Sequence, residues 1–230
     1  MKYGQIAGSK KVNYAIYRCF DYLCEKDQQA FVKKFREQPQ DSDQIMHTFR
    51  ELVVGAYLSS RGFEARHEYP VESKTPDWCI LDDRLAVIAV VELVNFHIDR
   101  VTESEIERQR QAKSVAVYWR DGNKSNVERL YYCIQDKMQK YQALVGRLGV
   151  PYVIAVFPEF EAAMDLEELR ACLYDNGAGL FHTYQDVSGV LYFYENGGQY
   201  YFKYEQNPNA LRVFDIPGGA FSLVRPQASQ

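Results

Sequence analysis

The sequence lacks three features that would assign it to a membrane, secreted or zinc-binding class. Its longest apolar run, residues 85–91, is far shorter than the roughly 18–20 residues that a membrane-spanning helix needs. No long apolar segment follows the N-terminal methionine, so no secretory signal is expected. The five cysteines are odd in number and show no C-x-x-C spacing, which argues against disulfide and zinc frameworks. We therefore expect a cytoplasmic protein with buried thiols and no membrane partner.

The chain also lacks an excess of basic residues. It has 27 Lys and Arg against 31 Asp and Glu, a net charge of −4. This balance argues against a strongly basic nucleic-acid-binding surface and leaves room for a local basic patch. The 47% of hydrophobic residues are enough for a core and exclude wholesale disorder. A length of 230 residues predicts one domain with elaborations, or at most two small domains.

Hydrophobic periodicity predicts an α/β fold. Apolar residues recur at helical spacing over residues 12–36, as one long or two short helices, and again over residues 42–61 and 127–148. Strand patterns cover residues 63–69, 77–81, 85–96 and 151–157, and the third of these is almost wholly apolar, as in a strand buried on both faces. Asp165 is expected to cap a short helix that ends at residue 173, and the polar residues 98–125 to form a partly helical excursion.

Near the C-terminus, residues 190–194 and 200–204 flank Asn196-Gly197-Gly198, a β-hairpin signal. The element order predicts a central mixed β-sheet flanked by helices. We expect an N-terminal helical extension over residues 1–41, a core over 42–180 and a C-terminal β-hairpin appendage over 181–230, packed together as one domain.

Three acidic residues stand at informative positions. Glu51 lies on the apolar helix before the first strand, Asp77 opens the second strand, and Glu92 interrupts the most apolar strand. A carboxylate inside an apolar run is costly unless it is paired or binds a metal. Because only a short turn separates the second and third strands, hairpin pairing is expected to bring Asp77 and Glu92 together. Converging carboxylates suit Mg²⁺ or Mn²⁺.

With these residues, the order of elements over about residues 42–175 resembles the PD-(D/E)XK nuclease superfamily and its restriction-endonuclease-like fold. The matching residues are Glu51, the Pro76-Asp77 pair, Glu92 and the Lys137-x-x-x-Tyr141 spacing on the following helix. The resemblance implies a three-layer core and a metal-dependent nuclease that hydrolyses DNA phosphodiester bonds. It also implies that Asp77 and Glu92 hold Mg²⁺ or Mn²⁺, with Glu51 as a further ligand.

One departure from the family pattern concerns the motif lysine, since Val94 occupies its position. Either Lys137 supplies the migrated lysine, or the site is degenerate and the chain is a nucleic-acid-binding, protein-binding or structural module. In the first case Lys137 would orient the water or stabilise the phosphate, and Tyr141 would contact the scissile phosphate. A homodimer is compatible both with an active nuclease and with a degenerate module.

Each of these residues also has an ordinary structural explanation. Glu51 and Lys137 would then be solvated or salt-bridged helix residues, Asp77 a strand-start residue, Glu92 one half of a buried ion pair, and Tyr141 a core residue. The tyrosines of the predicted hairpin would stack either on bases or on one another across the strands.

Overall fold

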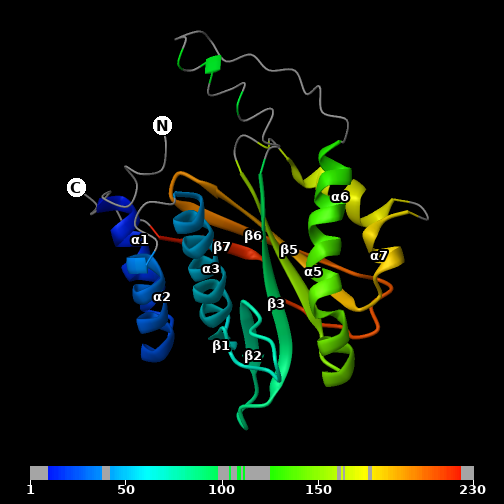
Figure 1. Cartoon of the computed structure of the whole chain (residues 1–230), viewed down its shortest axis with the longest axis horizontal. Coiled ribbons are helices and arrows are strands. Elements are labelled where there is room, and N and C mark those ends of the chain that lie inside the picture. Colours follow the sequence, from blue (N-terminus) through cyan, green and yellow to red (C-terminus); the bar gives the residue numbers. More distant parts are fainter. Residues whose placement is uncertain are drawn as a thin grey trace.

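The computed structural model describes residues 10–37, 42–97, 104, 108, 109, 111, 125–159, 162, 164–175 and 178–223. Within them the chain forms an α/β structure around a seven-stranded mixed sheet, with helices on both faces (Figure 1). The predicted α/β class and mixed sheet are therefore confirmed. The predicted excursion over residues 98–125 lies almost entirely outside the described residues.

The strands follow one another across the sheet in sequence order. β3 pairs with β4 in parallel and β4 with β5 in parallel, whereas all other neighbours are antiparallel. The three central strands are consequently joined by crossover segments, and both outer parts of the sheet are built from antiparallel neighbours. The strands are β1 (Glu64–His67), β2 (Trp78–Leu81), β3 (Val87–Phe96), β4 (Tyr152–Pro158), β5 (Val187–Asn196), β6 (Gln199–Gln206) and β7 (Gly219–Ser222).

The helices form two layers, one on each face of the sheet (Figure 1). On β3, Val91 and Leu93 point toward α3, and Val90 and Val94 point toward α5, so the strand is buried on both faces as its apolar sequence predicts. The first layer consists of α1 (Lys10–Phe20), α2 (Glu25–Glu37) and α3 (Ser42–Ser60), and the second of α5 (Asn126–Leu148), α6 (Leu166–Tyr174) and α7 (Leu180–Thr183).

Local sequence signals explain where the two longer helices of the second layer begin. Ser125 and Glu128 form a capping box at the start of α5, and Asp165 and Glu168 form another at the start of α6. The left-handed backbone of Gly149 (φ 68°) ends α5. The predicted role of Asp165 as a helix cap is confirmed.

The C-terminal hairpin differs from the expected appendage. β5 and β6 do form a hairpin around Gly197 and Gly198, but β5 also pairs in parallel with β4, with Val153 opposite Gly189. The hairpin is therefore an integral part of the central sheet. Across it, Tyr194 and Tyr201 stack with ring centroids 5.4 Å apart, which supports the cross-strand explanation for these tyrosines.

The structure also defines two element boundaries more exactly than the sequence pattern did. The helical pattern over residues 12–36 is two helices, α1 and α2, because the chain turns between Phe20 and Glu25. β3 begins at Val87 because Leu85 has a positive φ (62°) in the turn after β2. Among the described residues, no helix has the length and apolarity needed to cross a membrane.

Candidate functional site

Asp77 and Glu92 meet at the start of β2, as the predicted hairpin pairing requires. β2 and β3 are antiparallel with Trp78 opposite Val91, so the preceding Asp77 lies beside Glu92. The backbone N–H of Asp77 donates to Glu92 Oε1 (2.8 Å), and the backbone N–H of Leu93 donates to Asp77 Oδ2 (2.7 Å). These reciprocal bonds hold both carboxylates in place between the strands.

Lys137 of α5 reaches the same two carboxylates. Its Nζ lies 2.8 Å from Glu92 Oε2 and 3.3 Å from Asp77 Oδ2. The side chain of Glu92 is fully buried, whereas those of Asp77 and Lys137 are 16% and 22% exposed, so the cluster opens toward solvent on the Asp77–Lys137 side. Lys137 therefore points into the protein. A buried ion pair is one explanation that the sequence offers for Glu92, and Lys137 is the partner in that ion pair.

The carboxylate pair carries more negative charge than Lys137 neutralises. Burial, and then repulsion from Asp77, raise the pKa of the Glu92 carboxyl above its ordinary value, although Lys137 opposes the shift. Burial disfavours the charged form of Lys137, but Asp77 and Glu92 outweigh it and raise the pKa of the ammonium. Lys137 is thus held as a cation, while the two carboxylates still repel each other.

Tyr141 lies one turn along α5 from Lys137 and is buried in the core on this face. Its hydroxyl donates to the carbonyl oxygen of Thr75 (3.2 Å), two residues before Asp77. Burial raises the pKa of the Tyr141 hydroxyl, and the nearby charges of Glu92 and Asp77 raise it further, so it stays a neutral donor. The side chain supports the segment that leads into Asp77, as a core residue would, while the predicted phosphate contact stays a prediction.

Val94, at the position of the missing motif lysine, is 5% exposed. It points toward α5, on the same face of β3 as Glu92, and packs in the apolar cluster that contains Ile134 and Met138. The ammonium beside the carboxylates is thus supplied by Lys137 of α5, and not by the β3 position two residues after Glu92, where the family motif has its lysine.

Glu51 is not brought to this cluster. It lies on α3, against the opposite face of the sheet, where its oxygens are bound by three side chains from three elements. The distances are 2.9 Å to Lys34 Nζ, 3.0 Å to His47 Nε2 and 3.3 Å to His67 Nε2. The expectation that Glu51 would join Asp77 and Glu92 as a ligand therefore has no geometric support, because α3 presents it to α2 and β1 instead.

The surroundings of Glu51 form a second polar cluster. Burial disfavours the charged form of this carboxylate, but hydrogen bonds from His47, His67 and Lys34 outweigh burial and lower the pKa of Glu51 well below its ordinary value. Lys34 also pairs with Glu68 (2.8 Å), and His47 Nδ1 lies 2.7 Å from Asn95 Nδ2. The i, i+4 spacing of His47 and Glu51 was visible in the sequence, but nothing there indicated that Lys34 and His67 would join them.

Asp77 and Glu92 are the side chains of this cluster that would hold a hard divalent cation, with water as its further ligands. In the described part of the chain, no group of three or more His, Cys, Asp or Glu side chains is arranged to hold a metal ion. Mg²⁺, however, is commonly bound by one or two carboxylates, with water and substrate phosphate as the other ligands. Burial and, after it, repulsion from Asp77 raise the pKa of Glu92, and additional positive charge beside these oxygens would relieve the repulsion.

Comparisons with protein-family models, with curated proteins and with solved structures find no match to this chain.

Proposed function

We propose that this chain is a metal-dependent nuclease of the PD-(D/E)XK type that hydrolyses DNA phosphodiester bonds. The observation that carries the proposal is the contact of one ammonium, Lys137 Nζ, with both Asp77 (3.3 Å) and Glu92 (2.8 Å). Two carboxylates and a lysine are the groups with which such an enzyme would bind a cation and stabilise a charged phosphate.

The order of elements supports a restriction-endonuclease-like core. α3 precedes the antiparallel strands β1, β2 and β3, and α5 then crosses over to β4, which is parallel to β3. α3 and α5 cover opposite faces of these four strands. This is the αβββαβ pattern that the resemblance implies, and it positions Asp77, Glu92 and Lys137 on the α5 face.

In this mechanism Asp77 and Glu92 would hold Mg²⁺ or Mn²⁺, which supplies charge neutralisation and a more acidic water. The Lys137 ammonium, turned from the carboxylates toward the substrate, donates a hydrogen bond to a non-bridging phosphate oxygen. Water attacks phosphorus and gives up a proton to the solvent, the bond from phosphorus to the leaving oxygen breaks, and that oxygen takes up a proton from the solvent. Tyr141, through Thr75, keeps the segment that carries Asp77 in place.

The test is incubation of labelled linear, circular and single-stranded DNA with the full chain in Mg²⁺ or Mn²⁺. We expect cleavage that is lost on chelation and reduced at least about 100-fold by E92A, because an interaction with the transition state of about 3 kcal/mol corresponds to that factor. K137M is expected to reduce cleavage similarly, because the phosphate would lose its cationic donor.

A matched control is D83N, which removes an exposed carboxylate from the turn of the same hairpin. Its cleavage rate should equal that of the unmodified chain. Cleavage that survives E92A at full rate would show that the proposed site does not perform the reaction.

One observation favours a second function, a nuclease-like module that binds nucleic acid or protein without cleaving it. Lys137 already forms ion pairs with both carboxylates, and Val94 leaves β3 without a lysine of its own. If Lys137 serves to neutralise the carboxylates, DNA would bind without being cleaved in any divalent cation. The same incubation, read out by both cleavage and gel shift, separates the two functions.

A further inference from the structure

The candidate site opens at an edge formed by α5 and the segment between β1 and β2. The hydroxyl of Tyr141 on α5 bonds to Thr75 of this segment, and Arg147 on the last turn of α5 pairs with Glu72 (2.5 Å). Asp77 follows the segment directly. The partly exposed side chains of Asp77 and Lys137 therefore lie where this segment contacts α5.

Two exposed lysines lie on the elements beside this opening and form no ion pair within the part of the chain that the structure describes. Lys74 precedes Thr75, and Lys140 lies one helical turn from Lys137, with its Nζ 4.8 Å from the centre of the Tyr141 ring. Among the described residues neither lysine forms an ion pair, whereas the charge of Arg147 is matched by Glu72 and that of Lys137 by Asp77 and Glu92. Lys74, on the segment before Asp77, and Lys140, on α5, therefore supply positive charge that no ion pair neutralises among the described residues.

We infer that Lys74 and Lys140 contact backbone phosphates of a DNA duplex and position it over the Asp77–Glu92 pair. This inference rests on the proposed nuclease function and adds the residues that bind its substrate. In the absence of a bound metal ion, the two carboxylates of the site outnumber its ammonium and repel a phosphate. Under these conditions the attraction comes from the cations beside the site, Lys74 and Lys140.

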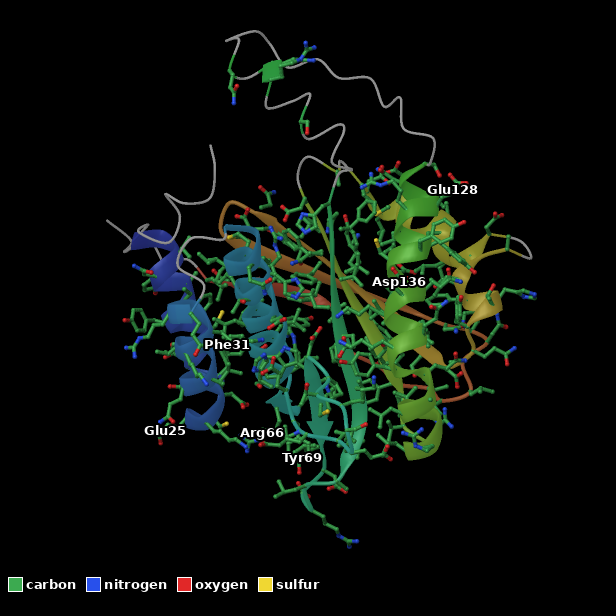
Figure 2. The ribbon with its side chains drawn as sticks, in the orientation of Figure 1. Glu25, Phe31, Arg66, Tyr69, Glu128 and Asp136 are labelled. Carbon is green, nitrogen blue, oxygen red and sulfur yellow. The ribbon has the colours of Figure 1, made fainter. Side chains whose placement is uncertain are left out.

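The charge on this side of α5 is not uniformly positive. Asp136, labelled on α5 in Figure 2, is exposed and lies four residues before Lys140, on the same side of the helix. Its carboxylate would repel a phosphate held by Lys140. The substitution D136N should therefore tighten DNA binding.

The experiment measures binding of a labelled DNA duplex to the full chain in EDTA by fluorescence anisotropy, as a function of salt. Each phosphate that a lysine neutralises adds about 0.9 to the slope of log K against log salt concentration. K74Q and K140Q should each lower the slope by about 0.9, and K74Q/K140Q by about 1.8. Each lysine variant should weaken binding to duplexes of different sequence equally, because phosphates are contacted and not bases.

The matched control is K203Q, which removes an exposed lysine from β6, separated from β3 by β4 and β5. Among the described residues Lys203 forms no ion pair, and K203Q should leave the slope unchanged. An equal loss of slope with K203Q, an unchanged slope in K74Q and K140Q, or no binding by the unmodified chain would each overturn the inference. Unchanged melting temperatures of all variants exclude unfolding as the cause.

Cleavage in Mg²⁺, measured on the same preparations, separates this inference from the proposed function. Cleavage with unaltered salt slopes in the lysine variants would overturn the phosphate contacts and leave the nuclease standing. Reduced slopes without cleavage by the unmodified chain would overturn the nuclease and leave a DNA-binding surface at this edge.

Discussion

Glu92 is completely buried, yet both of its carboxylate oxygens are bound. Oε1 accepts from the backbone of Asp77, and Oε2 accepts from Lys137. A buried carboxylate without such partners would cost several kcal/mol or take up a proton. The environment of Glu92 is therefore a balance between one nearby cation and one nearby anion, and it should respond strongly to the removal of either.

Removal of the cation gives a prediction at the scale of the residue. In K137M the carboxylates of Asp77 and Glu92 remain without a counter-charge, so we expect a loss of about 1–3 kcal/mol in the free energy of unfolding. The pKa of Glu92, already raised, should rise further. A group with a raised pKa contributes stability at low pH that is lost as pH increases, so the loss should be larger at about pH 8 than at about pH 6.

Urea unfolding at both pH values provides the measurement. The matched control is K140M on the same helix, which should change stability by no more than about 0.5 kcal/mol. In the double variant E92Q/K137M the loss should be smaller than the sum of the single losses, because the neutral amide needs no cation. Additive losses would mean that the ion pair contributes nothing to folding.

At the scale of elements, α3 and β2 contact each other through Gly55 and Trp78. Trp78 follows Asp77 and is fully buried, and its Nε1 donates to the carbonyl oxygen of Glu51 (2.9 Å). Its ring lies over Gly55, where a Cβ would meet Trp78 Cζ2 at 1.9 Å. α3 thus holds the residue next to Asp77 from the opposite face of the sheet, and this approach requires glycine at position 55.

The substitution G55A tests this contact. The added methyl group must displace the Trp78 ring or the helix, and overpacking of this kind costs about 1–3 kcal/mol. The control G146A lies on an exposed turn of α5, where a Cβ would meet nothing within 4 Å. It should stabilise the protein by about 0.5–1 kcal/mol, because alanine favours the helix.

Thermal unfolding of both variants is the measurement. If G55A were as stable as the unmodified chain, the α3–β2 contact would be looser than the structure describes. If G146A were destabilising, α5 would depend on flexibility at that turn.

At the scale of the whole molecule, the Glu51 cluster joins separate parts of the fold on the first helical layer. Lys34 comes from α2, His47 and Glu51 from α3, and His67 from β1, and His47 also contacts Asn95 at the end of β3. The cluster thereby attaches the N-terminal helices to the sheet. Its stability depends on the ionised form of Glu51, whose pKa is lowered by these partners.

The pH dependence of stability follows from the sign of that shift. A carboxyl whose pKa is lowered by folding stabilises the folded state at pH values above its ordinary pKa of 4.5. This stabilisation is lost as the pH falls below that value. E51Q should therefore be destabilised by about 3–5 kcal/mol near neutral pH, and the difference from the unmodified chain should shrink with acidification.

Chemical denaturation along a pH series measures this difference, and D83N, with an exposed carboxylate, should show none. A difference between E51Q and the unmodified chain that stays constant down to acidic pH would mean that Glu51 is not held ionised by the cluster.

Local patterns in the sequence predicted the parts of the site that depend on neighbouring elements. A short turn joins β2 and β3, so the meeting of Asp77 and Glu92 follows from hairpin pairing alone. The i, i+4 spacing of Lys137 and Tyr141 was also visible, but it left open whether Lys137 faces solvent or the carboxylates. The role of Glu51 was not predictable in this way, because its partners come from α2 and β1 and the helix face gives no information on which side of the sheet α3 lies.

The same distinction holds for the strands. The hairpin of β5 and β6 was visible from Asn196-Gly197-Gly198, whereas the parallel pairing of β5 with β4 joins segments that no turn connects. The predictions of a cytoplasmic location, a DNA partner and a homodimer stay predictions.

By itself, the sequence determined the class of fold, the helix starts at Ser125 and Asp165, and the pairing of Asp77 with Glu92, because each depends on interactions between residues close along the chain. Tertiary structure alone decided that Lys137 points at the carboxylates, that Glu51 lies on the opposite face and that β5 joins the central sheet. These outcomes depend on how elements distant in sequence pack to bury their apolar faces, and periodicity within one element does not specify its partner.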